Sequence, residues 1–311
     1  MAADTSYDAV IIGAGHNGLA AAIHLAKRGW KVGLFEAKGE AGGAVKTREL
    51  TLPGFRHDLA AMNLSMFAGS PFLKEHGEAL GRHGLAFVPA AHCFASVFPD
   101  STWFGVSKDV GTTLARLNAI NPKDAAAWSD MLNRFGKDAP HIFGLLGNAM
   151  PSFATAKVIW KAWRENGTAW TLDMLRFLTL PTRAWADSHF ESAKVKATVA
   201  TWGMHLDFPP DVAGGALFPY LESMANQAFG MVIGQGGADM MIRAMTGYLK
   251  ELGGELHLNA PVAEVMRSGA GAGGIRLIDG RSITARKAVI ANVTPQLLFG
   301  KLLPGGSGKA A

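Results

Sequence analysis

The chain has 311 residues, of which 49% are hydrophobic and 18% charged, enough to bury a large core and form two domains. Its net charge of +5 is scattered along the chain. This pattern argues against nucleic acid as a partner and would suit an anionic cofactor or a membrane surface equally well. The single cysteine, Cys93, excludes a disulfide framework and a C-x-x-C redox pair.

The first 36 residues predict a βαβ unit. The β-branched run Tyr7–Ile12 is typical of a buried parallel strand. The pattern Gly13-x-Gly15-x-x-Gly18 follows at once and opens an Ala-rich segment with helical spacing. A second strand is expected at Lys31–Phe35. Strand, glycine turn, helix and strand in this order are typical of a dinucleotide-binding fold.

Each glycine of the turn has an expected mechanical role. Gly13 makes the tight turn, Gly15 lets the backbone approach a pyrophosphate, and Gly18 lets the helix pack closely on the strand. The helix start at His16 and Asn17 offers free N–H groups and a positive dipole end to the phosphates.

An acidic residue and a second glycine pair extend the pattern. Glu36, 23 residues after Gly13, is placed to accept hydrogen bonds from an adenosine ribose. Ala22 should keep the helix against the sheet, and Gly29 suits its left-handed C-terminal position. With Gly42-Gly43 beyond the acid, the pattern is more similar to that of FAD-binding flavoproteins than to that of NAD dehydrogenases.

The next segment carries less information. Gly54–Pro71 is poor in charge, and it is either a segment beside the isoalloxazine ring or a plain buried connection. A helix is expected at Pro71–His83 and a strand at Leu85–Val88. Ala91–Phe98 and Thr102–Val106 flank a turn-like insert and predict a hairpin.

Helical patterns then extend from residue 108 to about 208. The expected helices are Val110–Ile120, Ala125–Phe135, Lys157–Asn166 and Met174–Leu180. Six tryptophans lie in this part, either as an aromatic core or as the lining of a pocket for a long apolar substrate. They are Trp128, Trp160, Trp163, Trp170, Trp185 and Trp202.

The C-terminal part returns to α/β patterns. A helix is expected at Asp239–Leu252, a flexible turn at Gly269–Gly274 and a hairpin turn at Asp279-Gly280. The expected strands are Glu255–Asn259, Pro261–Val265, Ile275–Ile278, Arg281–Thr284 and Lys287–Asn292. The predicted fold class is α/β: a Rossmann-like FAD/NAD(P)-binding domain, with a parallel sheet and a β-meander, and an inserted, largely helical substrate domain. The discontinuous FAD-binding domain should comprise residues 1–84 and 230–311, and the insert residues 85–229.

These segments together resemble the phytoene desaturase-like FAD-dependent oxidoreductases, within them the group around pyridine nucleotide-disulfide oxidoreductase domain-containing protein 2. The resemblance rests on residues 10–29, Glu36 with Gly42-Gly43-Ala44, Gly236-Gly237, the run GGELHLNAPVAEV, the hairpin 274–283 and the run AVIANVTP. It implies FAD as the cofactor and a backbone contact from Val262 to the adenine. The residues expected to hold FAD are Gly13, Gly15, His16, Asn17, Gly18, Glu36, Ala37, Gly42, Gly43, Ala44, Val262, Ala291 and Asn292.

The family's long C-terminal segment does not follow Asn292, so we expect a truncated chain that ends in a loop from Pro304 to Ala311. No catalytic residue is identified, and neither a metal motif nor a serine hydrolase motif is found.

The function expected is an FAD-dependent dehydrogenase or desaturase that moves hydride from a small apolar substrate, isoprenoid or lipid-like, to flavin. A catalytically inactive or regulatory flavoprotein-like fragment, a flavin amine oxidase and an NAD-dependent dehydrogenase remain alternatives. A cytoplasmic or membrane-peripheral location is expected, and a homo-oligomer is left open.

Overall fold

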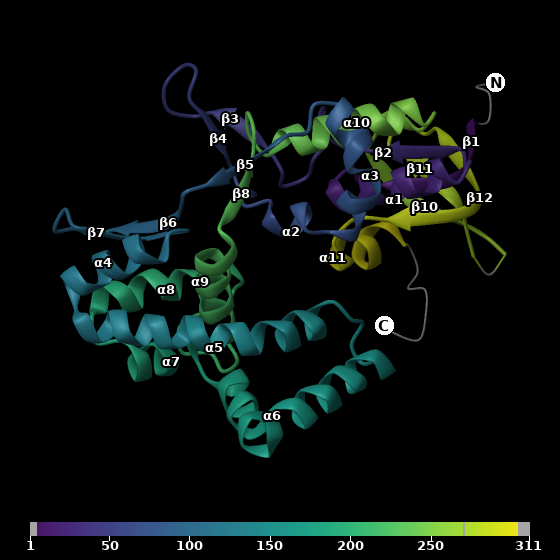
Figure 1. The fold of residues 1–311 in the computed structure, drawn as a ribbon. Helices are drawn as coiled ribbons and strands as arrows, with labels where there is room; N and C mark the ends of the chain where they lie inside the picture. The colour runs from purple at the N-terminus through teal and green to yellow at the C-terminus, as the bar shows by residue number, and fades with distance from the viewer. Residues whose placement is uncertain (1–4, 270, 304–311) are drawn as a thin grey trace. The chain divides into compact units, whose positions relative to one another are not determined.

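The computed structural model describes residues 5–269 and 271–303 (Figure 1). The chain divides into two compact units. One comprises the segments up to Val88 and from Val232, and the other runs from Pro89 to Met231. The strands β5 (Phe87–Ala90) and β8 (Met231–Gly234) carry the chain from one unit to the other. The loop expected from Pro304 to Ala311 lies outside the described residues.

The first unit is built on a six-stranded sheet in the order β10-β11-β12-β1-β2-β9. Strands β12, β1, β2 and β9 run parallel, and β10 and β11 extend the sheet in antiparallel fashion. The α/β prediction, with a parallel sheet and a meander, is therefore confirmed. The strands are β1 (Thr5–Ile12), β2 (Val32–Phe35), β9 (Glu255–His257), β10 (Val262–Ser268), β11 (Gly271–Leu277) and β12 (Ser282–Ala291).

Strand β1 is buried on both faces. Ala9 and Ile11 pack into a core with the helices α1 (His16–Lys27), α3 (Pro71–Arg82) and α10 (Asp239–Glu251). Val10 and Ile12 alternate with them and pack into a second core with residues of β10 to β12. This double burial explains why β1 reads as a continuous apolar run. Within α1, Ala22 is fully buried, and Gly29 has φ of +80° just past the helix end, as expected.

The first unit also contains smaller elements: β3 (Thr47–Glu49), β4 (Arg56–Asp58), α2 (Ser65–Ala68), α11 (Pro295–Leu297) and a π-helical turn, η1 (Leu298–Leu302). Gly54–Pro71 is mostly exposed, with Leu64 its one buried residue. The alternative of a plain buried connection is therefore wrong, and the place of this segment beside a flavin stays a prediction.

The last strand differs from expectation. Two strands were expected between Arg281 and Asn292, whereas β12 is a single strand. Its first residues pair with β11, and it also runs parallel to β1 as far as Ala291. No glycine or proline interrupts this stretch, and the irregularity in its register with β1, between Tyr7 and Ala9, does not end the strand. The expected turn Gly269–Gly274 is also shorter, because β11 begins at Gly271.

The second unit is a hairpin and six helices (Figure 1). The hairpin of β6 (His92–Val97) and β7 (Trp103–Ser107) is confirmed. The two helices expected between 157 and 180 are the two parts of α6, broken at Gly167, where φ is +82°. The helices are α4 (Val110–Ile120), α5 (Pro122–Leu146), α6 (Phe153–Thr179), α7 (Thr182–His189), α8 (Ala193–His205) and α9 (Leu217–Phe229). Of the helices in the described ranges, none combines the length and apolar character needed to cross a membrane.

The tryptophans of the second unit do not form one group. Trp128 and Trp185 are buried in its core, whereas Trp160 and Trp163 on α6 are 57% and 45% exposed. An aromatic core therefore accounts for only part of the set.

Candidate dinucleotide-binding site

Three strand ends meet at one point of the first unit. The N–H of Gly13, just after β1, donates to the carbonyl of Phe35 at the end of β2 (2.8 Å). On the other side, the N–H of Asn292, just after β12, donates to the carbonyl of Ile12 (2.8 Å). The chain leaves β1 toward β2 and returns later on the opposite side at β12. Ligands of open α/β sheets bind at such a reversal of strand order, at the carboxyl ends of the strands.

The glycines of the turn after β1 stand where a side chain would meet neighbouring atoms. Gly13 has φ of +93°, and a Cβ there would lie 2.5 Å from the carbonyl oxygen of Asn292. A Cβ at Gly18 would lie 2.2 Å from the carbonyl oxygen of Gly13, and one at Gly15 would lie 3.2 Å from Asn292 Nδ2. The glycines thus allow helix, turn and β12 to approach one another closely.

The N-terminus of α1 opens onto this turn. Gly15 is the N-cap residue, and no side chain caps the helix there. The first N–H groups of a helix have no partner within it, and together with the helix dipole they attract anions. His16 and Asn17 of this first turn line a cavity in front of it.

The second glycine pair lies against the first. The N–H of Gly42 donates to the carbonyl of Ala14 (2.8 Å), and Gly42 itself has φ of +119°. A Cβ on Gly43 would lie 3.4 Å from the Cα of Gly15. The two glycine segments, about 27 residues apart, therefore share one surface of the cavity.

Glu36, directly after β2, is fixed by backbone groups. Its Oε2 accepts the N–H of Ala14 (2.9 Å), and its Oε1 accepts the N–H of Lys38 (2.9 Å). The carboxylate is half-buried, and each oxygen keeps a lone pair for another donor. These hydrogen bonds join separate segments of the chain, so no local sequence pattern predicts them.

The cavity has a volume of about 470 Å³, within the range of small-molecule sites. Eleven of the expected cofactor residues line it: Gly13, Gly15, His16, Asn17, Glu36, Ala37, Gly42, Gly43, Ala44, Val262 and Asn292. Gly18 packs beneath the turn instead, and Ala291 pairs with Ile12 within the sheet. Lys301, on η1, also lines the cavity and was not foreseen, since no motif surrounds it.

Comparison with known proteins identifies the family. The family model described as flavin-containing amine oxidoreductase matches residues 18–298. The chain belongs to this family. As a flavin-containing amine oxidoreductase family member it has FAD as its cofactor, which confirms the cofactor expected from the sequence.

Relatives of the chain include both groups named by the resemblance. The chain is 29% identical to mouse pyridine nucleotide-disulfide oxidoreductase domain-containing protein 2, over 96% of this chain and 55% of that protein. It is also 29% identical to a neurosporene-forming phytoene desaturase of Rhodobacter capsulatus, over 95% and 54%. The chain thus spans about half the length of the curated relatives it matches. Among solved structures, a putrescine oxidase variant shares the fold with a TM-score of 0.58 and 20% identity, over 94% of this chain and 59% of that one.

The residues present fit an adenine dinucleotide. An uncapped helix start, a glycine-rich turn and a nearby lysine suit a diphosphate. The fixed carboxylate of Glu36 suits the hydroxyl groups of a ribose.

Proposed function

We propose that the protein is an FAD-dependent oxidoreductase of the dehydrogenase or desaturase type, which moves hydride from an apolar, isoprenoid or lipid-like substrate to flavin. The observation that carries the redox assignment is the cavity at the carboxyl ends of β1, β2 and β12, with its uncapped helix start and the fixed carboxylate of Glu36. When bound, the flavin supplies the hydride-accepting chemistry. The residues of the chain bind and orient the dinucleotide.

An apolar groove in the second unit supports the apolar substrate class. Leu132, Phe135 and Phe143 on α5 line it with Phe229 at the end of α9, in a volume of about 380 Å³. All eight residues of its lining are apolar or glycine, so no side chain there offers a charged or hydrogen-bonding partner to an ammonium group. The names of the matched desaturases, which act on phytoene, favour the same class.

A flavin amine oxidase is the second candidate, because the matching family model carries that description. The two differ in the substrate that reduces the cofactor. In an anaerobic assay with FAD-loaded protein, we expect bleaching of the oxidised flavin by isoprenoid hydrocarbons with activated C–H bonds. Bleaching by putrescine or cyclohexylamine instead would establish the amine oxidase. If the protein does not bind FAD and no substrate bleaches the flavin, the redox assignment is wrong.

Contact with a membrane surface belongs to the same proposal, since an isoprenoid substrate would dissolve in lipid. Helix α6 exposes Phe153, Trp160 and Trp163, with Lys157 over the ring of Phe153 and Arg164 over that of Trp160. Exposed aromatic rings beside basic groups are typical of helices at lipid interfaces. Cosedimentation with anionic vesicles tests this; we expect binding that falls when Trp160 and Trp163 are replaced by serine.

A further inference from the structure

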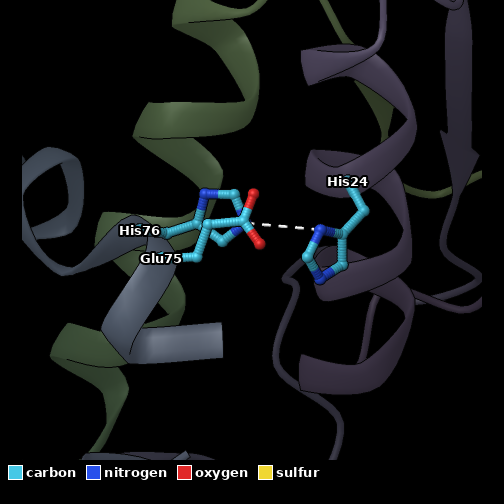
Figure 2. A group of neighbouring side chains, drawn as sticks. All are labelled: His24, Glu75 and His76. Atoms are coloured by element: carbon cyan, nitrogen blue, oxygen red, sulfur yellow. Dashed lines mark hydrogen bonds and ion pairs between the residues drawn. The ribbon is translucent and has the colours of Figure 1, made fainter. Parts of the chain in front are cut away.

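A group of ionisable side chains lies between two helices of the first unit, separate from the dinucleotide cavity. Figure 2 shows His24 on α1 facing Glu75 and His76 on α3. His76 Nε2 lies 3.3 Å from His24 Nδ1 and 3.7 Å from Glu75 Oε1. One nitrogen or oxygen atom from each of the three residues lies within 4.8 Å of the others.

These distances suit a shared metal ion. Zinc–nitrogen bonds of about 2.0–2.1 Å in a tetrahedral arrangement place two ligand nitrogens roughly 3.3 Å apart. Two imidazole nitrogens and one carboxylate oxygen are a donor set that zinc accepts, with a fourth position for water.

The state of His76 provides an independent observation. Its side chain is fully buried, against the rings of Phe72 (centroids 4.6 Å apart) and Tyr248 (5.8 Å). Within residues 5–269 and 271–303, its Nδ1 has no hydrogen-bond partner, and the only hydrogen-bond neighbour of Nε2 is His24. Nε2, which faces a second imidazole nitrogen and a carboxylate oxygen, is the atom through which this buried ring can bind a shared ion.

We propose that His24, Glu75 and His76 bind one Zn²⁺ ion that links α1 to α3. His76 then carries its proton on Nδ1, which leaves Nε2 for the metal. Lys27 competes with the ion, because its Nζ lies 3.0 Å from Glu75 Oε1. The ion has a structural role: His24 stands eight residues beyond His16, about 12 Å along α1 from the helix end that lines the cavity. Zinc would therefore hold in place the helix that presents its N-terminus to the dinucleotide.

The test is a titration of the chelator-treated, tag-free full chain with ZnCl₂ by calorimetry, followed by thermal unfolding. We expect one ion per chain and a higher Tm with zinc. His24→Ala and Glu75→Gln, both at accessible positions, should each weaken binding by about tenfold or more. Lys27→Met should strengthen it, roughly 1.5- to 5-fold, because an exposed ion pair no longer competes. His83→Ala is the matched control, since it removes a histidine just beyond α3 that the site does not use.

Equal zinc affinity in the unaltered chain, His24→Ala and Glu75→Gln would overturn the proposal, as would the absence of any saturable binding. Because His76→Ala leaves a hole in a packed core, the two accessible variants carry the test, with circular dichroism to confirm that they fold. X-ray absorption at the zinc edge gives a second readout. Two imidazole ligands with oxygen are expected, and fewer than two would contradict the site.

Discussion

Replacing Glu36 separates two roles of its carboxylate: it accepts the N–H of Ala14 in the glycine turn, and it is expected to bind the ribose of FAD. In Glu36→Ala the buried N–H of Ala14 loses its acceptor, whereas the exposed N–H of Lys38 can donate a hydrogen bond to water instead. An unsatisfied buried N–H costs about 1–3 kcal/mol, so the cofactor-free protein should be less stable by that amount. In a chain of this size, each kcal/mol lowers Tm by about 2–4 °C or less.

The same substitution should also weaken the binding of FAD. Charge-assisted hydrogen bonds from the ribose contribute about 1.5–3 kcal/mol, equivalent to a roughly 10- to 150-fold rise in Kd. Glu36→Gln is the matched control: its amide oxygen can still accept the N–H of Ala14, so stability should largely return while FAD affinity recovers only in part.

Flavin fluorescence titration measures the affinity, and thermal unfolding without FAD measures the stability. If Glu36→Ala lowers Tm but leaves the Kd for FAD within twofold of that of the unaltered chain, Glu36 stabilises the turn and does not bind the ribose. If neither quantity changes, the reasoning from the backbone hydrogen bonds is refuted as well.

Three further substitutions test other parts of the structure. Gly18→Ala should weaken FAD binding and lower Tm, because the new Cβ would lie 2.2 Å from the carbonyl oxygen of Gly13. Gly81→Ala is the control: Gly81 is a helical glycine with open space around it, so Tm should rise slightly. Lys301→Gln should weaken FAD binding about two- to fivefold at low salt and less at high salt, whereas Lys301→Arg should keep the affinity. If Lys301→Gln binds FAD as tightly as the unaltered chain, the diphosphate lies elsewhere. Asp138→Ala should cost at least about 2 kcal/mol in denaturant unfolding, since Tyr220 loses a buried acceptor; a smaller loss would mean that water replaces the carboxylate.

The parts of the site that the sequence predicts are those encoded locally. The strand from Tyr7, the glycine turn and α1 follow one another within about 20 residues, and each has its own composition signal. Lys301 reaches the cavity only because η1 returns to the first unit, and no local pattern marks it. The helices of the second unit were predicted least well: α7, α8 and α9 were missed, since their apolar faces are fixed by packing in one core with Trp185, Val199 and Tyr220.

Distant segments complete the glycine turn. Asn292 donates its backbone N–H to Ile12 and its side-chain amide to the carbonyl of Gly13 (3.4 Å). The same amide stands 2.9 Å from the position that a Cβ on Gly18 would occupy. On the other side of the turn, the carboxylate of Glu36 accepts a hydrogen bond from the N–H of Ala14. The turn is thus shaped by β12 and β2 as well as by its own glycines, so loss of either contact should disturb the cavity without changing a single residue of the glycine pattern. This explains why such a pattern alone is weak grounds for a dinucleotide site, and why it becomes strong when the acidic residue and the returning strand are both in place.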